Sequence, residues 1–500
     1  MKLNTILLIQ ALCLSPASAF YIWKPCVEDG SCTHPAHAAV VKDKVEAREN
    51  IVTLDLVRRA HPRATKGHKR PSSPRVGGFG KRDSNTYEVL EANDPSYAYS
   101  VGIDQDGSDL SYFISVGVGS EETPMYMLVD TGAGSTWLMS ADCSTDACKL
   151  HNTFSASESK TFVEEDQNFR ISYGSGSVNG STVTDSLNVA GLKVSMTFGL
   201  ANYTSDDFES FPFDGILGLS LNAGSTDSFT KKLTEASEIR NKIFSVFLAR
   251  ASSNVNNGEL TLGGINSARY TGDITYTSLA SKTNGDWSIP LDGVSFDGSD
   301  AGISGRTGYI DTGTSYIFGP PDDVEKLHSM IDGAKTSDNS RWSVPCDTDK
   351  TLEFTFGGKS WALQTEDWIS VASDGNCYSY IMGIEVVKGG WLMGDAFIKN
   401  VYSVFDITNR RIGFAEAKQS TPTSTTASAS ATSTARGSTT TASKKGSSSA
   451  VETSATAEAQ QSESTAAADT AAVAQTAGAV LLPLNVFALI LPLAVAVLSL

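Results

Sequence analysis

One short motif that combines a carboxylate with a hydroxyl group occurs twice in this chain of 500 residues. The two copies are Asp130-Thr131-Gly132 and Asp311-Thr312-Gly313, and each follows an apolar run. An apolar-apolar-Gly segment begins 86 residues after the first aspartate, at 216–218, and 81 residues after the second, at 392–394. A single triplet is a weak signal, but the repeat with its matching neighbours predicts two similar lobes. Each lobe would offer one carboxylate from a strand-to-loop turn.

Two carboxyl groups a few ångströms apart cannot both ionise cheaply, so they share one proton. The ionised carboxylate can take a proton from a water molecule while the protonated one polarises a substrate carbonyl. Such a pair hydrolyses an amide without a metal, a covalent nucleophile or a histidine. The glycine of each motif lets the backbone approach a carboxylate, and the threonine hydroxyl can brace one loop against the other.

Three alternatives compete with this interpretation of Asp130 and Asp311. They could be Asx-turn aspartates at strand ends, but the duplication argues against a purely structural role. The chain could be a non-catalytic adhesin or inhibitor-binding protein, which two intact Asp-Thr-Gly loops disfavour. It could also be a glycosidase, which would call for sugar-stacking aromatic residues where the sequence has Gly-rich loops.

Short apolar runs separated by Gly, Asn, Asp and Ser turns fill residues 85–417, which predicts a mostly-β body. Helices are expected at Thr230–Ile239 and Pro321–Ile331. We expect residues 83–275 to form an N-terminal lobe and residues 276–417 a C-terminal lobe. Strands are expected at Leu110–Val118, Met125–Val129, Phe169–Tyr173, Ile243–Ala249, Glu259–Leu262, Leu352–Phe356 and Val401–Phe405.

The charge of the chain is divided unevenly. The sequence has 39 basic and 56 acidic residues, a net charge of −17, but residues 1–82 hold 14 Lys or Arg and 6 Asp or Glu. Residues 83–500 therefore carry a net charge of −25. A body this acidic would repel phosphate backbones, so nucleic-acid binding is not expected. Only His151 and His328 lie beyond residue 82, so we expect no His-rich metal site there.

From about residue 105 to residue 417 the body resembles the pepsin-family (A1) aspartic endopeptidases. Residues 130–137 resemble the first active-site motif, with its Trp, and residues 311–315 resemble the second. Residues 173–176, Tyr-Gly-Ser-Gly, look like the flap whose Tyr hydrogen-bonds toward that Trp and closes over substrate. The resemblance implies a bilobal fold of two β-barrel-like lobes with an active-site cleft between them.

The same resemblance implies hydrolysis of protein or peptide substrates at acid pH by Asp130 and Asp311, without a cofactor or metal and by a monomer. Support of the flap and of the carboxyl pair would come from Tyr173, Gly174, Trp137, Thr131, Gly132, Thr312, Gly313 and Thr314. Two departures from the family pattern matter. Ala133 stands where many members have a Ser that hydrogen-bonds the catalytic Asp, which should raise that carboxyl's pKa and favour activity at less acid pH. The loop after Trp137 lacks the long acidic insertion of some yapsins, which leaves a strict preference for basic residues without support.

The N-terminal end has the features of a secreted precursor. Residues 1–19 combine Lys2, an apolar run and an Ala-Ser-Ala end, which is typical of a signal peptide rather than a buried helix. Residues 20–82 are basic and contain three dibasic pairs, the last at Lys81-Arg82. We expect a propeptide that acts as an intramolecular inhibitor and is removed near Asp83. The alternative is an unstructured spacer.

The C-terminal end predicts a tether. Residues 418–470 read as a Ser/Thr-rich stalk, with 26 Ser or Thr among residues 420–470. Residues 471–500 read as a GPI-attachment signal with a hydrophobic tail, and the candidate attachment residues are Ala467, Ala468 and Asp469. A transmembrane anchor is the alternative. With this tail the chain is most similar to fungal GPI-anchored members such as the yapsins, which places it at the plasma membrane or cell wall.

Four cysteines lie in the body, and in an oxidising compartment they allow three pairings. We expect Cys143–Cys148 and Cys346–Cys377, because each of these loops stays within one half of the body. Cys26 and Cys32 belong to the leader, and their pairing stays open. Asn179 and Asn202 lie in Asn-x-Ser/Thr sequons and are candidates for N-glycosylation.

Overall fold

A computed structural model of the chain describes residues 85–420, apart from residues 254, 282–285 and 373–374. The chain divides into two compact units, Met1–Thr426 and Ala427–Leu500, and every described residue belongs to the first. The predicted signal peptide, propeptide, attachment signal and all but the first residues of the stalk, as well as Cys26 and Cys32, lie outside the described residues. Within residues 85–420 no helix has the length and apolar character needed to cross a membrane.

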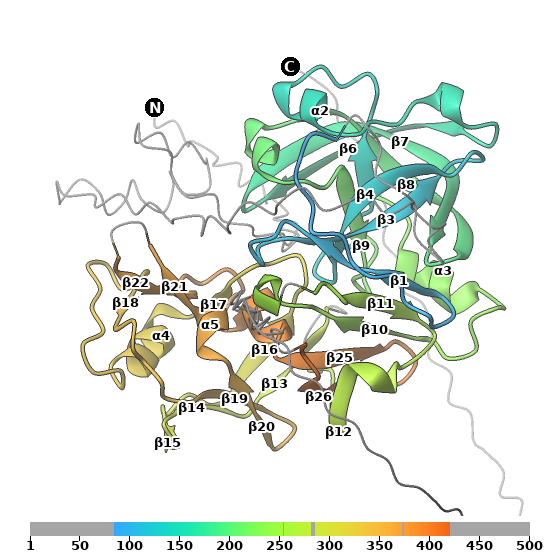
Figure 1. The fold of residues 1–500 in the computed structure, drawn as a ribbon. Helices are drawn as coiled ribbons and strands as arrows, with labels where there is room; N and C mark the ends of the chain where they lie inside the picture. The colour runs from blue at the N-terminus through green and yellow to red at the C-terminus, as the bar shows by residue number, and fades with distance from the viewer. Residues whose placement is uncertain (1–84, 254, 282–285, 373–374, 421–500) are drawn as a thin grey trace, which may run out of the picture. The chain divides into compact units, whose positions relative to one another are not determined.

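The described residues form a mostly-β structure, as the sequence predicts (Figure 1). Its strands are β1 Ser100–Gly102, β2 Asp104–Gln105, β3 Tyr112–Val118, β4 Thr123–Asp130, β5 Trp137–Met139, β6 Val163–Tyr173, β7 Gly176–Val189, β8 Leu192–Thr204, β9 Gly215–Gly218, β10 Ile243–Phe247, β11 Glu259–Leu262, β12 Tyr270–Ser278, β13 Ser288–Leu291, β14 Gly293–Phe296, β15 Ser299–Asp300, β16 Arg306–Ile310, β17 Ile317–Gly319, β18 Ser343–Val344, β19 Leu352–Phe356, β20 Lys359–Leu363, β21 Ile369–Val371, β22 Cys377–Ser379, β23 Ile381–Gly383, β24 Trp391–Met393, β25 Val401–Asp406 and β26 Arg411–Ala417.

The helices are short. They are α2 Asp146–Leu150, α3 Phe229–Glu235, α4 Pro321–His328, α5 Thr365–Trp368 and α6 Asp395–Ile398, with 3₁₀ turns at Ala156–Glu158, Asp206–Ser210, Ala251–Ser253 and Ser267–Arg269. Both predicted helices are present, but each ends earlier than the sequence suggested. The chain leaves α3 at Ala236, whose backbone is extended. Lys242 Nζ then donates to the carbonyl oxygens of Ala236 (2.7 Å) and Ile239 (2.6 Å), which satisfies groups that a longer helix would have used.

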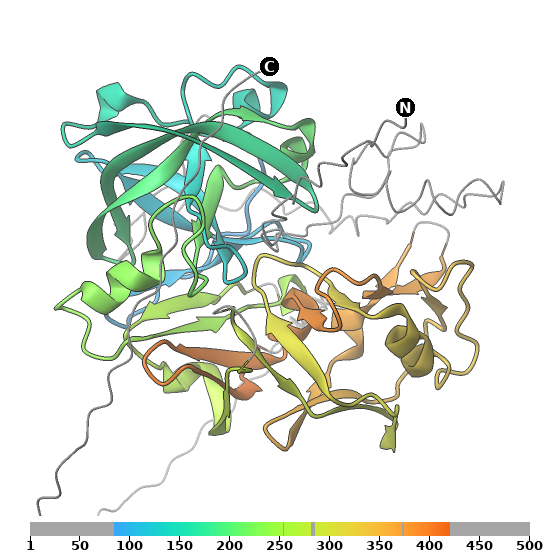
Figure 2. The ribbon, with the colours of Figure 1, turned by 180° about the vertical axis from the view of Figure 1, so that it is seen from behind.

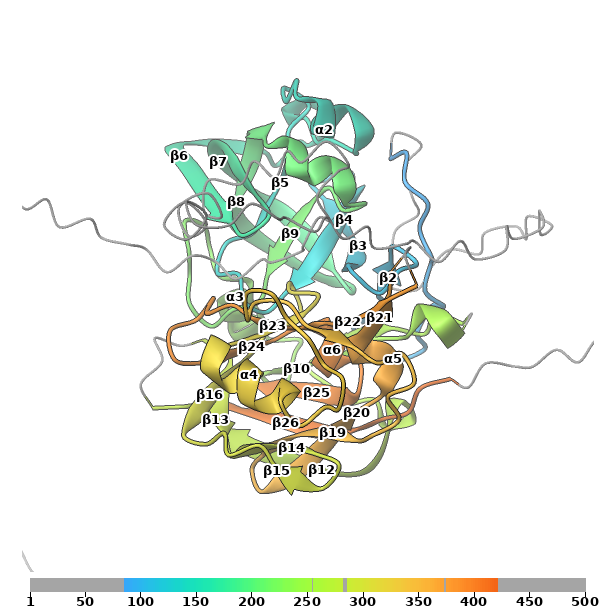
Figure 3. The same ribbon diagram turned by 90° about the vertical axis from the view of Figure 1, so that its left-hand side faces the viewer.

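Two sheets repeat one arrangement around the two Asp-Thr-Gly motifs. The first has the order β2-β3-β4-β9-β5-β8-β7-β6 and the second β13-β16-β24-β17-β23. In each, the strand that leads into the motif (β4 or β16) pairs in parallel with the apolar-apolar-Gly strand (β9 or β24). That strand pairs in antiparallel with the strand after the motif (β5 or β17). Figure 3 shows β4 and β9 side by side. The duplication predicted from the sequence is thus present in the topology.

A third sheet combines strands of both predicted lobes. Its order is β1-β11-β10-β25-β26-β12, and β10 pairs with β25 from Ile243 opposite Asp406 to Val246 opposite Ser403. Strand β12 crosses the predicted boundary between residues 275 and 276, which stays a prediction. Figure 2 shows this sheet from behind, below the long teal strands of residues 163–204.

The largest apolar core extends from the first sheet through the third to the second. Phe244 of β10 stacks on Phe405 of β25 with ring centroids 4.6 Å apart, and Trp287 meets Phe405 edge-on at 5.1 Å. Trp287 Nε1 also donates to the carbonyl oxygen of Leu219 (2.8 Å), directly after β9. Burial of each large ring contributes ~2–3 kcal/mol, so this core holds the two motif-bearing sheets in a fixed relation.

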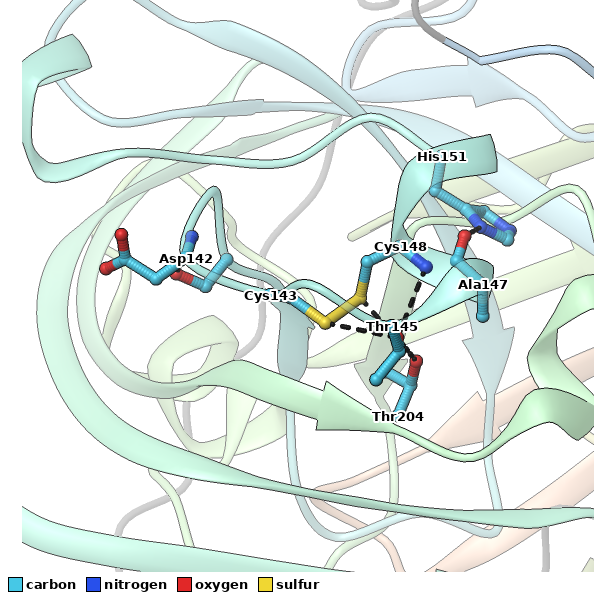
Figure 4. Close-up of a disulfide and its surroundings, with 8 residues drawn as sticks. Asp142, Cys143, Thr145, Ala147, Cys148, His151 and Thr204 are labelled. Carbon is cyan, nitrogen blue, oxygen red and sulfur yellow. Dashed lines mark hydrogen bonds between the residues drawn. A yellow bond between two sulfur atoms is a disulfide. The ribbon is translucent and has the colours of Figure 1, made fainter.

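Both predicted disulfides are present, Cys143–Cys148 and Cys346–Cys377. Figure 4 shows the first, at the start of α2. Thr145 caps this helix by accepting from the backbone N–H of Cys148, and its hydroxyl lies 3.0 Å from that of Thr204 on β8. The short disulfide loop is thereby fastened to the first sheet.

Candidate active site

Asp130 is the last residue of β4, and Asp311 directly follows β16. Both side chains are buried, with exposed fractions of 0% and 1%. The backbone of each aspartate is fixed by the neighbouring parallel strand, because Asp130 O accepts from Leu219 N (2.8 Å) and Asp311 N donates to Met393 O (3.0 Å). The apolar-apolar-Gly segments therefore set the position of the carboxyl groups.

One backbone N–H joins the two carboxyl groups. Gly132 N lies 2.9 Å from Asp130 Oδ1 and 3.2 Å from Asp311 Oδ1, so it donates to both. Ala133 N donates to Asp130 Oδ1 as well (2.8 Å). Gly313 N donates to Asp311 Oδ1 (2.9 Å). The structure thus brings the two sequence-predicted aspartates together at one point.

The donors to the two carboxyl groups are not the same. The residue three positions after Asp311 is Thr314, whose hydroxyl donates to Asp311 Oδ2 at 2.7 Å. The corresponding position after Asp130 is Ala133, which has no hydroxyl. Asp130 therefore receives N–H donors alone from its own loop, whereas Asp311 receives an additional O–H donor.

The threonines of the two motifs clamp the loops together in a symmetric way. Thr131 N donates to Thr312 Oγ1 and Thr312 N donates to Thr131 Oγ1, both at 3.1 Å. Each hydroxyl then donates to a carbonyl oxygen on the other side, Thr131 Oγ1 to Ile310 O (2.8 Å) and Thr312 Oγ1 to Val129 O (2.6 Å). These four bonds are buried, and they fix the positions of the two loops, and so of the two carboxyl groups, relative to each other.

Both glycines face the carboxyl group of the opposite motif. A Cβ atom on Gly132 would lie 2.7 Å from Asp311 Oδ1, and one on Gly313 would lie 2.5 Å from Asp130 Oδ2. Real Cβ atoms do not approach neighbours this closely. Glycine is required at both positions because any side chain would separate the two carboxyl groups.

The environment favours a protonated pair. Burial raises the pKa of Asp130 well above its ordinary value, and the nearby charge of Asp311 raises it further. Burial also raises the pKa of Asp311, to about 6, although the Thr314 hydroxyl and the Gly313 N–H act against this rise. Because two adjacent buried charges repel, the loss of one proton makes the loss of the second harder, so the pair passes through a state with one shared proton.

A β-hairpin made of β6 and β7 lies above Asp130. Its turn is Gly174-Ser175, and Tyr173 pairs with Gly176 at the end of the hairpin. Trp137 Nε1 donates to the hydroxyl oxygen of Tyr173 at 2.7 Å. Tyr173 is buried, which raises the pKa of its hydroxyl group, and the nearby charge of Asp130 raises this pKa further. This hydrogen bond is the one that the flap resemblance implies, and closure over a substrate stays a prediction.

Phe208 supports this hairpin, a role that no sequence pattern indicates. It is fully buried and meets the Trp137 ring edge-on at 5.4 Å between centroids. It also lies against Gly176, where a Cβ would come within 2.8 Å of its ring. Ser205 N donates to Ser177 O (2.9 Å) and fixes the adjacent strand β7. An aromatic residue in a 3₁₀ turn has no periodicity by which a sequence pattern could mark it.

Strand alternation shows which faces of the two sheets carry the carboxyl groups. On β4, Val129 belongs to the large core and Leu128 to a second apolar cluster with Trp137 and Tyr173. Asp130, two residues after Leu128, therefore points to the side of that second cluster. On the other side, Tyr309 precedes Asp311 by two residues on β16. It packs against a separate cluster formed by Tyr316, Phe318, Met382 and Leu392. The carboxyl pair is thus flanked by one apolar face from each sheet.

Comparisons with known proteins identify the family of the chain. Residues 111–417 match the family model of the eukaryotic aspartyl proteases. The aspartic-type endopeptidase ctsD of Aspergillus fumigatus is 39% identical over 360 residues, which cover 70% of this chain and 76% of that protein.

Two further relatives align over shorter stretches. Vacuolar protease A of Neurospora crassa is 34% identical over 295 residues, covering 57% of this chain and 72% of its own. Cathepsin D of Dictyostelium discoideum is 34% identical over 301 residues, covering 57% of this chain and 77% of its own. With the family model spanning most of the described residues, the chain belongs to the eukaryotic aspartyl protease family and is a protease of the hydrolase class.

Proposed function

We propose that Asp130 and Asp311 are the catalytic pair of this protease and that the enzyme is a secreted, surface-tethered endopeptidase active at acid pH. The observation that carries the catalytic part is the single Gly132 N–H that donates to both carboxyl groups, at 2.9 and 3.2 Å. The two carboxyl groups are buried, accept from one N–H donor, and are held in place by the hydrogen bonds of Thr131 and Thr312. They therefore form the proton-sharing pair that amide hydrolysis needs.

In this mechanism the donors assign different roles to the two groups. The Thr314 hydroxyl stabilises the ionised form of Asp311, so Asp311 is the carboxylate that takes a proton from the attacking water. Asp130, without a hydroxyl donor from its own loop, keeps the shared proton and donates it to the substrate carbonyl oxygen. The water oxygen bonds to the carbonyl carbon, and the resulting diol breaks its C–N bond as a proton passes to the leaving nitrogen.

The Tyr173 hairpin would close over the bound peptide. The hydrogen bond from Trp137 fixes the position of the phenol ring, and the Gly174-Ser175 turn allows the hairpin end to move. Tyr173 and Trp137 then exclude water other than the nucleophile from the carboxyl pair.

Adding a hydroxyl beside Asp130 should shift the pH optimum toward acid. In Ala133→Ser the new donor would stabilise the ionised form of Asp130 and lower its pKa. The reciprocal variant Thr314→Ala removes the donor from Asp311 and should shift the profile toward neutral pH. The measurement is kcat/KM against pH for the three proteins. An Ala133→Ser profile that stays in place or moves toward neutral pH would contradict the account.

The ends of the chain support the cellular part of the proposal. Residues 1–19 would direct secretion, and the basic residues 20–82, with a net charge of +7, would cover the acidic body until cleavage after Lys81-Arg82. The stalk of residues 418–470 would hold the enzyme away from the membrane. GPI attachment near Ala467, Ala468 or Asp469 would tether it at the plasma membrane or cell wall.

N-glycosylation would modify the side of the first sheet that carries the flap. Asn202 on β8 is exposed, and Asn179 on β7 is half-buried. Asn179 lies opposite Tyr203, beside the irregularity in the pairing of these two strands. Glycans at both positions would therefore be close neighbours.

Two assays on the full-length chain expressed in a fungal host test the proposal. Surface-associated cleavage of peptides between pH 3 and 7 should be abolished by pepstatin, an inhibitor of aspartic proteases. Phosphatidylinositol-specific phospholipase C should release the activity from protoplasts, whereas a transmembrane anchor would resist it. Cleavage that pepstatin does not affect would refute the catalytic proposal, and activity that stays bound after lipase treatment would refute the GPI anchor.

A further inference from the structure

Tyr309 occupies the apolar face beside Asp311 without being fully covered. It is half-buried, and its ring lies against Gly390, where a Cβ would come within 2.9 Å of Tyr309 Cε2. Asp311 directly follows β16, two positions after Tyr309, so strand alternation places the ring and the carboxyl group on the same side. A substrate side chain next to the cleaved bond on the Asp311 side would meet this ring.

Asp286 lies beside Tyr309 at the end of the adjacent strand. Ser288 of β13 pairs with Tyr309, and Trp287 O accepts from Ile310 N (2.8 Å), so Asp286 is the first residue beyond the paired stretch. Burial raises the pKa of Tyr309, and the charge of Asp286 raises it further, which agrees with the place of Asp286 two residues before the partner of Tyr309.

The Asp286 carboxylate has no cation beside it in the described part of the chain. Its hydrogen bond comes from Asn222 Nδ2 (3.3 Å), a residue of the other predicted lobe, so the carboxylate stands where the two lobes meet. Burial raises its pKa, and the Asn222 bond acts against the rise, with no charged neighbour contributing. Two more deeply buried carboxylates do have cation partners, Asp367 with Arg250 and Lys399, and Glu259 with Arg269.

A half-buried carboxylate that forms no ion pair with any described residue, next to an aromatic ring, is suited to a positively charged group. A cation placed there would gain a charge-assisted hydrogen bond from Asp286 and a cation–π contact with Tyr309. It would also remove the cost of holding an uncompensated charge at a partly buried position. An acidic substrate side chain would instead be repelled.

We propose that Asp286 and Tyr309 form a subsite that accepts a Lys or Arg side chain of the substrate next to the cleaved bond, on the Asp311 side. This proposal rests on the proposed function, because it places the subsite relative to the Asp130–Asp311 pair. It gives the enzyme a preference for basic residues that does not depend on the acidic loop insertion that the chain lacks after Trp137.

The test compares peptides that differ by one charge at one position. A peptide series carries Lys, norleucine or Glu in turn at each of the four positions nearest to the cleaved bond, and kcat/KM is measured with the processed full-length enzyme. We expect Lys to be preferred to norleucine and Glu at one position. In Asp286→Asn the ratio of kcat/KM for the Lys peptide to kcat/KM for the norleucine peptide at that position should fall about tenfold.

Two variants of Tyr309 give a measurement that is independent of Asp286. Tyr309→Phe keeps the ring and should retain most of the preference for Lys, whereas Tyr309→Leu should lose a part of it. Asp273→Asn removes a charge from an exposed position on β12 and should leave the ratio unchanged, which separates a local effect from one of net charge.

Two results would overturn the subsite. One is that the wild-type enzyme cleaves the Lys, norleucine and Glu peptides with equal kcat/KM at all four positions. The other is that the ratio of kcat/KM for the Lys peptide to that for the norleucine peptide stays unchanged in both Asp286→Asn and Tyr309→Leu. Failure of the wild-type enzyme to cleave any peptide in the series would instead overturn the proposed function, and the subsite with it.

Discussion

Replacing Gly313 by alanine is expected to abolish peptide cleavage while the protein still folds. The new Cβ would lie 2.5 Å from Asp130 Oδ2 and 2.6 Å from Oδ1, so the carboxyl group and the Gly313 loop would have to separate by more than about half an ångström. The backbone of Gly313 does not require a positive φ, so the expected effect comes from this contact and not from strain. A displacement of this kind at reacting groups reduces the rate by roughly a hundredfold or more.

Gly293→Ala provides the matched control for this prediction. Gly293 also lies in the C-terminal half, and a Cβ there would find its nearest neighbour, Ile303 O, at 4.0 Å. Gly132→Ala should reproduce the loss, because its Cβ would press on Asp311 instead. Thermal unfolding and kcat/KM would be measured for all three variants. Full activity in a folded Gly313→Ala protein would show that the two motifs do not lie against each other.

The repeated motif allowed much of the site to be predicted. Asp130, Asp311 and their apolar-apolar-Gly partners could be recognised because an internal repeat preserves residue type and spacing in both copies. The pairing of β4 with β9 and of β16 with β24 follows from that repeat. The disulfides could be predicted because only three pairings were available and two of the loops are local.

Features that depend on long-range contacts could not be predicted. The third sheet joins β10 and β25, which are more than 150 residues apart, and no local pattern specifies such a partner. Phe208 and Asp286 are single residues in irregular segments, so their position beside Trp137 and Tyr309 follows only from packing. The ends of α3 and α4 also differ from prediction. Lys242 Nζ donates to the carbonyl oxygens of Ala236 and Ile239 just beyond α3, whereas shorter-range backbone bonds, Met330 N to Leu327 O and Ile331 N to His328 O, follow α4.

The central claim is that Asp130 and Asp311 act as one unit, and the second large effect follows from it. Asp130→Asn and Asp311→Asn each keep the shape of the side chain but remove the shared proton. Each should lower kcat/KM by a factor on the order of a thousand or more, since neither remaining carboxyl group can serve as both acid and base. In the double variant the reduction in kcat/KM should be about as large as in either single variant, and not the product of the two reductions.

The most direct measurement is therefore peptide cleavage by the wild type, the two single variants and the double variant across pH 3 to 7. Each protein would be purified from the full-length precursor, with its N-terminus verified by mass spectrometry and its fold by thermal unfolding. Asp273→Asn, at an exposed position, serves as the control that should keep full activity. We expect cleavage at acid pH by the wild type and the control alone. Cleavage that persists in a folded Asp130→Asn or Asp311→Asn protein would contradict this expectation.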